Sequence, residues 1–235
     1  MRILLLSSSR IYGRGYLEHA QEQIRDILGG TRRLLFVPYA LFDRAEYARR
    51  ARERFAPWGC ELESLHEAAD PRAAVAAADA VFVGGGNTFR LLKALYENEL
   101  LAPLRARIAQ GVPYIGSSAG SIVAGPTLKT TKDMPIVEPP SFATLGLVDF
   151  QISPHYLDPD PASTHMGETQ EERILQFLEE NATPVAGLRE GAMLRIDGRA
   201  VTLLGSAGAR LFRRGAEPVE TLPVADLTHL LAEAA

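Results

Sequence analysis

A serine set between two glycines is the residue of this sequence best placed to act as a nucleophile. Ser118 is the central residue of Gly116-Ser-Ser-Ala-Gly120, and an apolar run over residues 112–115 leads directly into this turn. Between a strand and a helix, G-x-S-x-G is typical of a nucleophile elbow, a strained turn that needs small residues on both sides of the serine. The N–H of Ala119 would then face a developing oxyanion. The sequence therefore predicts a nucleophilic Ser118, with a small-residue turn without chemistry as the alternative.

A second glycine-rich turn stands in Val83-Gly-Gly-Gly-Asn-Thr-Phe89, again directly after an apolar run. Glycine lets backbone N–H groups approach an anion closely. Because the ends of parallel strands share one edge of a sheet, we expect Gly85 or Gly86 to supply a second donor to the same oxyanion. The run matches no nucleotide-binding pattern, so a phosphate cradle is the weaker interpretation. We expect Asn87 to cap the helix that follows.

A nucleophilic serine needs a base, and the chain has five histidines. His155 directly follows the run 148–152, which is read as a strand, whereas His165 stands in a polar segment. A strand end holds a base more rigidly than a loop does, so we favour His155. The remaining three are interpreted as ordinary surface or interface residues: His19, His66 and His229.

Two acidic residues are candidates for orienting the histidine. Asp133 would give the chain order serine, aspartate, histidine, which one large class of hydrolases uses. Glu190 follows a short apolar strand and precedes a glycine, and it would give the order serine, histidine, glutamate. Both orders can work, so both residues stay candidates.

The elements that must position these residues alternate between strands and helices. Four short apolar runs are separated by segments with helical spacing: residues 3–6, 34–37, 80–83 and 112–115. Continuous apolar strands with helical crossovers predict an α/β fold with a mainly parallel sheet and helices on both faces. After a helix at about 168–180, four shorter segments and turns such as Asp197-Gly198 predict an antiparallel hairpin or edge: residues 184–188, 192–196, 200–204 and 209–212. No linker divides the sequence, so we expect one domain over residues 1–235.

The composition excludes several classes of protein. With 46% hydrophobic and 23% charged residues, the chain is neither a disordered tail, a collagen-like fibre nor a membrane protein. The formal net charge of −4 leaves no basic excess for nucleic acid. A single cysteine, Cys60, excludes an internal disulfide and argues against a cysteine-based metal site. The first apolar run is too short for a signal peptide or a membrane span, so we expect a cytoplasmic protein without membrane contact.

Five ordered blocks of the sequence resemble peptidase E, the family of α-aspartyl dipeptidases. They are residues 83–89, 114–120, 130–136, 153–156 and 167–169. The resemblance implies a cytoplasmic serine peptidase that hydrolyses dipeptides with N-terminal aspartate. It implies a flavodoxin-like sheet similar to that of class I glutamine amidotransferases, small peptides as partners, and neither a cofactor nor a metal; a homodimer is compatible with it. Carried over by position, Ser118 is the nucleophile, His155 the base and Glu190 or Asp133 the third member, with Glu190 preferred and Asp133 shaping the pocket.

One position departs from the family pattern where the substrate is expected to bind. After Gly167-Glu-Thr169 the family commonly has an arginine that is expected to pair with the aspartate side chain of the substrate, but this sequence has Gln170. Glutamine cannot replace the charge or the paired hydrogen bonds of arginine, so relaxed specificity is expected. Four other cations are candidates for supplying the charge: Arg173, one turn later on the same helix, and Lys129, Lys132 and Arg189.

Two rival functions stay open at this point. A cyanophycinase-like or β-aspartyl peptidase shares the serine elbow, although Met134-Pro-Ile136 after Thr-Thr-x-Asp favours the dipeptidase. A non-catalytic small-molecule-binding module would use the two glycine turns without turnover. The second rival predicts that ligand binding survives Ser118→Ala, whereas an enzyme would lose turnover and keep its fold.

Overall fold

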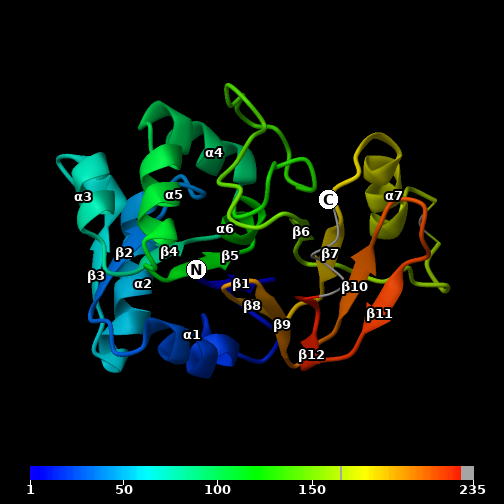
Figure 1. The fold of residues 1–235 in the computed structure, drawn as a ribbon, viewed down its shortest axis with the longest axis horizontal. Coiled ribbons are helices and arrows are strands. Elements are labelled where there is room, and N and C mark those ends of the chain that lie inside the picture. The colour runs from blue at the N-terminus through cyan, green and yellow to red at the C-terminus, as the bar shows by residue number, and fades with distance from the viewer. Residues whose placement is uncertain (165, 229–235) are drawn as a thin grey trace.

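A large mixed sheet between two layers of helices forms most of the molecule, in a computed structural model that describes residues 1–164 and 166–228 (Figure 1). Its strands, in spatial order, are β12 Ala225–Asp226, β9 Ala200–Gly205, β8 Ala192–Asp197, β1 Arg2–Leu6, β5 Tyr114–Ser117, β4 Val81–Val83, β2 Arg33–Val37 and β3 Glu61–Ser64. The helices are α1 Gln21–Leu28, α2 Arg44–Phe55, α3 Pro71–Ala77, α4 Thr88–Glu97, α5 Leu101–Ala109, α6 Ala119–Ile122 and α7 Gln170–Glu180. From β1 to β3 neighbouring strands are parallel, and beyond β1 the sheet continues antiparallel through β8, β9 and β12.

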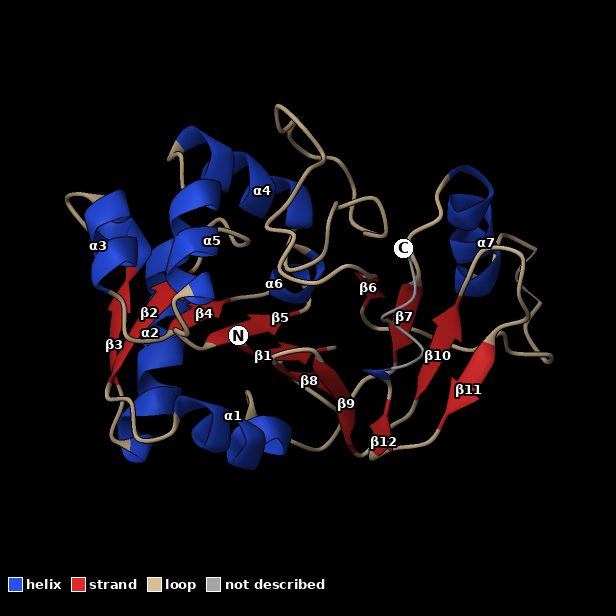
Figure 2. Cartoon of the chain, viewed as in Figure 1, coloured by secondary structure: helices blue, strands red, loops and turns tan. Residues whose placement is uncertain are grey.

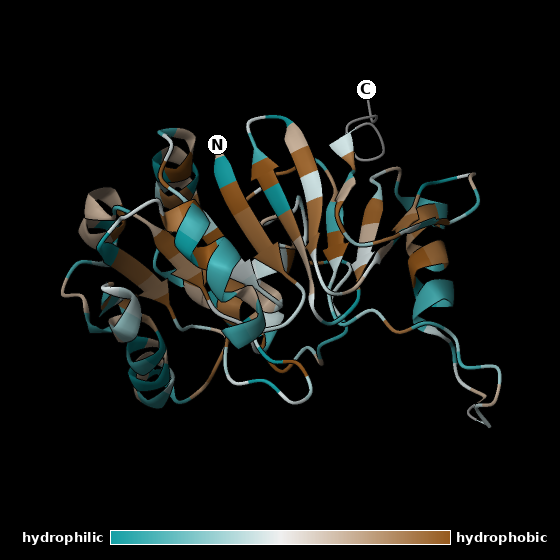
Figure 3. Ribbon diagram, turned by 90° about the horizontal axis from the view of Figure 1, so that it is seen from below, coloured by the Kyte–Doolittle hydropathy of each residue, from teal (hydrophilic) through white to brown (hydrophobic). Residues whose placement is uncertain are grey.

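Alternating side chains explain why helices cover both faces of this sheet. Along β1, Ile3 and Leu5 belong to the apolar cluster shared with α4 and α5, whereas Leu4 and Leu6 belong to the cluster shared with α1 and α2. Figure 2 shows these two helical layers on opposite sides of the strands. Strands that are apolar on both faces have to be covered on both, which is the arrangement that the sequence predicts. In Figure 3 the central strands are hydrophobic, and hydrophilic residues lie on the outer surfaces of the helices.

A second sheet stands beside the first, and its strands lead into the segments that contain His155 and Glu190. Its strands, in order, are β11 Val219–Thr221, β10 Ala209–Phe212, β7 Val185–Leu188 and β6 Gln151–Ser153. The helix α7 packs near β7 and β10 through an apolar cluster that contains Ile174, Leu178, Val185 and Phe212. The chain crosses from this sheet to the large one between β7 and β8, because β8 pairs with β1.

The structure corrects three details of the predicted elements. The edge strand β3 was not predicted, because its Glu-Leu-Glu-Ser sequence reads as polar. The strand predicted over 148–152 begins only at Gln151, since the N–H groups of Leu147 and Val148 donate to the carbonyl of Ala124 instead of joining a ladder. The predicted hairpin at Asp197-Gly198 forms between β8 and β9, but the neighbouring segments form the separate second sheet rather than an edge of the first.

The arginine-rich segment of α2 illustrates how a helix presents one apolar face. Tyr47 and Phe55 are buried, while Arg49 pairs on the outer side with Glu46 and Glu53. The charges are therefore those of a solvated helix face. No helix in the two described stretches is long and apolar enough to cross a membrane.

Candidate active site

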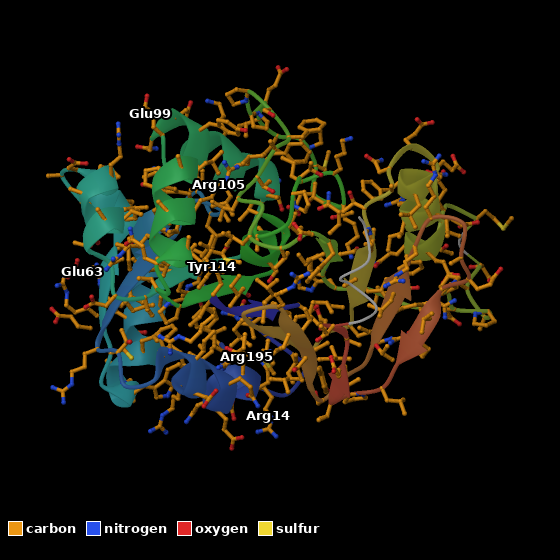
Figure 4. All side chains as sticks on the ribbon, viewed as in Figure 1. Arg14, Glu63, Glu99, Arg105, Tyr114 and Arg195 are labelled. Atoms are coloured by element: carbon orange, nitrogen blue, oxygen red, sulfur yellow. The ribbon has the colours of Figure 1, made fainter. Side chains whose placement is uncertain are left out.

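The turn after β5 holds Ser118 in a strained conformation at the carboxyl edge of the parallel strands. Its φ of 51° and ψ of −108° lie outside the regions that a side chain normally allows. A Cβ on Gly116 would lie 2.5 Å from the carbonyl oxygen of Gly120, and a Cβ on Gly120 would lie 2.1 Å from that of Val83. The buried Tyr114 hydroxyl donates to the Gly120 carbonyl at 2.6 Å. Figure 4 labels Tyr114 at the centre of the molecule. Only glycine therefore lets β4, β5 and α6 meet closely enough to form this elbow.

The ring of His155 reaches the serine from the second sheet. The Nε2 atom of His155 lies 3.0 Å from the Oγ of Ser118. The backbone N–H of His155 donates to the Oγ of Ser7 at 2.9 Å, and that hydroxyl donates to the carbonyl of Leu188 at 2.8 Å. Ser7 directly follows β1 and Leu188 ends β7, so one buried hydroxyl links the backbone of His155 to both sheets.

Of the two acidic candidates, only Glu190 contacts the imidazole. Its Oε1 lies 2.8 Å from the Nδ1 of His155. A carboxylate can only accept, so Nδ1 carries the proton and Nε2 is left to accept the Ser118 hydroxyl. The side chains of His155 and Glu190 are 42% and 50% exposed, which leaves this pair open to a ligand.

Asp133 is engaged elsewhere, at the start of α4. Its Oδ2 accepts hydrogen bonds from the N–H and the hydroxyl of Thr88, both at 2.6 Å, and from the hydroxyl of Thr131 at 3.1 Å. The carboxylate therefore fastens the loop before residue 134 to the N-terminus of α4.

Asn87 has a similar anchoring position. Its Oδ1 accepts from the N–H of Arg90, which makes it the N-cap of α4 as the sequence predicts, and its Nδ2 donates to the carbonyl of Met134 at 2.9 Å. Asn87 and Asp133 together tie one loop to one helix end.

The glycine-rich turn after β4 lies directly against the serine. A Cβ on Gly85 would be 3.0 Å from the Cβ of Ser118. Gly86 has a φ of 137°, and a Cβ there would lie 2.6 Å from the carbonyl oxygen of Ala40. The two glycine turns are therefore neighbours, as expected for the ends of adjacent parallel strands β4 and β5.

Backbone N–H groups from both glycine turns adjoin Ser118, and that of Gly85 interacts electrostatically with the hydroxyl of Tyr47. The amides of Gly86 and Ala119 meet no acceptor from the part of the chain that the structure describes. Both amides are thus free to donate to a ligand.

Gln170 lies at the N-terminus of α7 and contacts a lysine. Its Oε1 accepts from the Nζ of Lys132 at 2.9 Å and from the N–H of Leu157 at 3.0 Å. The same Nζ donates to the carbonyls of Pro154 and His155, at 2.6 and 2.9 Å. Loss of hydration lowers the pKa of Lys132 to about 8.

The other cations named from the sequence have their own partners. Arg173 pairs with Glu168 at 3.6 Å. Arg189 forms short hydrogen bonds with the carboxylates of Asp158 and Glu220, at 2.6 to 2.8 Å. Lys129 donates to the side chain of Asn181 at 3.0 Å.

Of the histidines set aside, His66 has a partner at the far edge of the sheet. Its Nδ1 lies 2.7 Å from the hydroxyl of Ser64, the last residue of β3. Burial lowers the pKa of His19. His165 and His229 lie outside the residues that the structure describes.

Sequence reasoning missed Ser7 and did not single out Lys132 among the four cations. Ser7 stands immediately after an apolar strand, at the same sheet edge as the glycine turns, and this placement is the one signal that points to it. Its contact with His155 joins residues 148 positions apart, which no local pattern reveals.

A serine on a strained elbow, a histidine and a carboxylate at one edge of an α/β sheet define the architecture of a serine hydrolase. Comparison with known proteins gives the family. The sequence model of peptidase family S51 matches residues 3–204, and the chain belongs to this family. The resemblance inferred from the five sequence blocks is thereby confirmed, and the protein is a peptidase.

Relatives agree with this assignment over nearly the whole chain. Peptidase E of Streptomyces coelicolor is 56% identical and is matched over 98% of this chain and 95% of its own. A Drosophila melanogaster protein named "Probable alpha-aspartyl dipeptidase" is 50% identical, over 97% of each chain. The crystal structure of a peptidase from an acI-B1 Actinobacterium superposes with a TM-score of 0.70 at 17% identity, covering 96% of this chain and 95% of its own. The predicted flavodoxin-like α/β fold class is confirmed.

Proposed function

We propose that this peptidase hydrolyses dipeptides with N-terminal aspartate by forming an acyl-enzyme on Ser118. The observation that carries the proposal is the continuous contact from Ser118 Oγ to His155 Nε2, at 3.0 Å, and from His155 Nδ1 to Glu190, at 2.8 Å. The substrate class rests on the names of the relatives, peptidase E and α-aspartyl dipeptidase. Small peptides are therefore the proposed partners.

The proposed reaction begins with proton transfer to His155. As Nε2 takes the hydroxyl proton, the Oγ of Ser118 attacks the carbonyl carbon of the first residue and its oxygen becomes an oxyanion. The free amides of Gly86 and Ala119 donate to that oxygen. The imidazolium then gives its proton to the departing amine. Water, deprotonated by the same ring, hydrolyses the ester and releases aspartate.

Glu190 is the proposed orienting carboxylate, with Asp133 in a supporting position. Glu190 holds the Nδ1 proton and stabilises the imidazolium that forms during each step. Asp133 is bound to Thr88 and Thr131, so it contributes to the shape of the pocket through the loop that it anchors.

Selection of the acidic side chain is the open part of the proposed function. The amide of Gln170 carries no charge, so it cannot bind a carboxylate as arginine does. Either aspartate preference is relaxed in this chain, or a different cation supplies the charge.

The proposed function is tested by measuring amino-acid release from Asp-Leu, Glu-Leu and Leu-Leu. We expect the wild type to cleave Asp-Leu, and Ser118→Ala to lose this activity with its fold intact. Ser117→Ala is the matched control: this neighbouring hydroxyl is buried and has no hydrogen-bond partner among the described residues, so the variant should stay active. Cleavage of all three peptides would establish relaxed specificity.

Three outcomes would contradict the proposal. Turnover that persists in Ser118→Ala would exclude the acyl-enzyme. Cleavage of β-aspartyl peptides in place of Asp-Leu would favour the cyanophycinase-like alternative. Binding of peptides without any turnover would favour the binding module.

A further inference from the structure

A small cavity at Ser153, the last residue of β6, is lined by three cations and by no carboxylate. Its volume is about 90 Å³, and it lies between the loop 129–132, the end of β6 and the first turns of α7. The charged residues of its lining are Lys129, Lys132 and Arg173. A polar cavity with this charge favours an anion.

The three cations are not equally available to a ligand. Arg173 is paired with Glu168, and Lys129 extends to the side chain of Asn181. The three N–H groups of the Lys132 ammonium donate only to neutral acceptors, two backbone carbonyls and the amide oxygen of Gln170, so an anion would bind by taking the place of one backbone carbonyl. Within residues 1–164 and 166–228 it forms no ion pair.

This lysine carries a positive charge at neutral pH without a carboxylate in contact. Loss of hydration lowers its pKa to about 8, which still leaves most of the ammonium protonated at pH 7. A partly dehydrated charge that lacks a counterion gains from binding an anion, because the attraction is weakly screened.

The position of Lys132 connects the cavity to the proposed base. Its Nζ donates to the backbone carbonyl of His155, the residue whose imidazole contacts Ser118. At about 30 Å³ for each water molecule, the cavity has room for about three waters, which suits a carboxylate and its methylene group but not a whole dipeptide.

We propose that Lys132 binds the side-chain carboxylate of the N-terminal acidic residue of the substrate, and that Gln170 orients the ammonium for this contact. The inference rests on the proposed function, because it takes an acidic dipeptide as the substrate of the Ser118 site. Gln170 suits the orienting task since its Oε1 is itself held by the N–H of Leu157. The charge that Gln170 lacks is thus supplied by a neighbour that it touches.

The first test compares kcat/KM for Asp-Leu with that for its uncharged analogue Asn-Leu. Lys132→Met should lower kcat/KM for Asp-Leu by about 100-fold, as expected for a lost charge-assisted hydrogen bond, and change that for Asn-Leu by less than about threefold. Lys132→Arg should retain most of the preference. Lys93→Met is the matched control, because Lys93 pairs with Glu97 on α4, and it should leave both values unchanged.

An equal loss for both peptides in Lys132→Met would overturn the inference, because it would mean that the lysine only supports the His155 carbonyl. Adding Gln170→Arg to Lys132→Met provides a second check. A new cation at the neighbouring position should restore the Asp-Leu preference by at least about tenfold, whereas a purely structural lysine would not be rescued.

The second test measures binding in the Ser118→Ala background by calorimetry, with Asp-Leu, Asp-Leu amide and Asn-Leu. If Lys132 binds the substrate side chain, Lys132→Met weakens the binding of Asp-Leu and of Asp-Leu amide to the same extent and leaves the binding of Asn-Leu unchanged. If weakening requires the free C-terminal carboxylate, the inference is wrong. Because binding is measured in Ser118→Ala without turnover, it is read separately from activity. If Asp-Leu binds in a Lys132-dependent way but the wild type does not cleave it, the proposed function is contradicted while the inference is supported.

Discussion

The two sides of the candidate site are positioned by different kinds of contact. Ser118 extends from the middle of the large sheet, between Ser117 and Ala119, both of which are fully buried. His155 and Glu190 extend from the second sheet, and about half of each side chain is exposed. On the serine side the backbone fixes the geometry through close glycine contacts, whereas on the histidine side a chain of side-chain hydrogen bonds fixes it.

This difference determines what each side tolerates. A backbone packed to van der Waals contact cannot accept an added atom without moving whole elements. A hydrogen-bonded side chain can be replaced by an isostere with little effect on the fold, but the replacement changes which atom carries a proton. We therefore expect substitutions of the closely packed glycines on the serine side to affect stability, and substitutions of the hydrogen-bonded side chains on the histidine side to affect turnover.

Among substitutions that keep the shape of the side chain, the largest expected effect comes from Glu190→Gln on the histidine side. The amide cannot stabilise the imidazolium or fix the Nδ1 proton, so kcat for Asp-Leu should fall by about 10³-fold, with thermal stability nearly unchanged. Asp133→Asn is the matched carboxylate-to-amide control, and it should lower kcat far less. The reverse ranking would identify Asp133 as the orienting residue.

The next effect concerns Gly120 on the serine side. A Cβ there would lie 2.1 Å from the carbonyl oxygen of Val83, so Gly120→Ala should lower the free energy of unfolding by about 3 kcal/mol or more. The control is Gly198→Ala in the β8–β9 turn, where φ is 63° and a Cβ would meet no atom within 4 Å. That variant should cost about 1 to 2 kcal/mol, from the left-handed backbone alone. Urea titrations of both measure the difference, and equal losses would refute the packing argument.

The smallest effect is the acid sensitivity of the histidine side. The Arg189 guanidinium holds the pKa of Asp158 below its ordinary value. A carboxyl with a depressed pKa stabilises the fold above about pH 4, and the contribution disappears as pH falls through the folded-state pKa. Since Asp158 is half exposed, Asp158→Asn should cost less than about 1 kcal/mol at pH 7.

Urea unfolding of the wild type and Asp158→Asn at pH 7 and pH 3 checks this prediction. The difference between the two proteins should shrink at pH 3. A difference of the same size at both values would show that the contact does not depend on the charge of the carboxylate.

The serine side could be predicted from the sequence because its determinants are local. The elbow needs an apolar strand, small flanking residues and one serine, and all of these fall within Val112–Gly120. The same reasoning predicts that Asn87 caps α4, since a cap depends on residues three apart.

The histidine side could be predicted only in part, because long-range pairing decides it. Glu190 and Asp133 both follow apolar segments, and only the passage of the chain from β7 to β8 brings Glu190 to the imidazole. The link through Ser7 and the charge of Lys132 likewise depend on which strands become neighbours. A second sheet made of three- and four-residue strands leaves too little periodicity to reveal that arrangement beforehand.

The central claim is that two separately positioned residues, Ser118 and His155, act as one catalytic unit. The most direct measurement is kcat for Asp-Leu in Ser118→Ala, His155→Ala and the double variant. Residues that act as a unit lose nearly everything in either single variant, so all three proteins should fall by about 10⁵-fold or more and agree within about threefold. If the losses of kcat from the two single variants multiply in the double variant, or if kcat of His155→Ala stays close to that of the wild type, the two residues do not act as one catalytic unit.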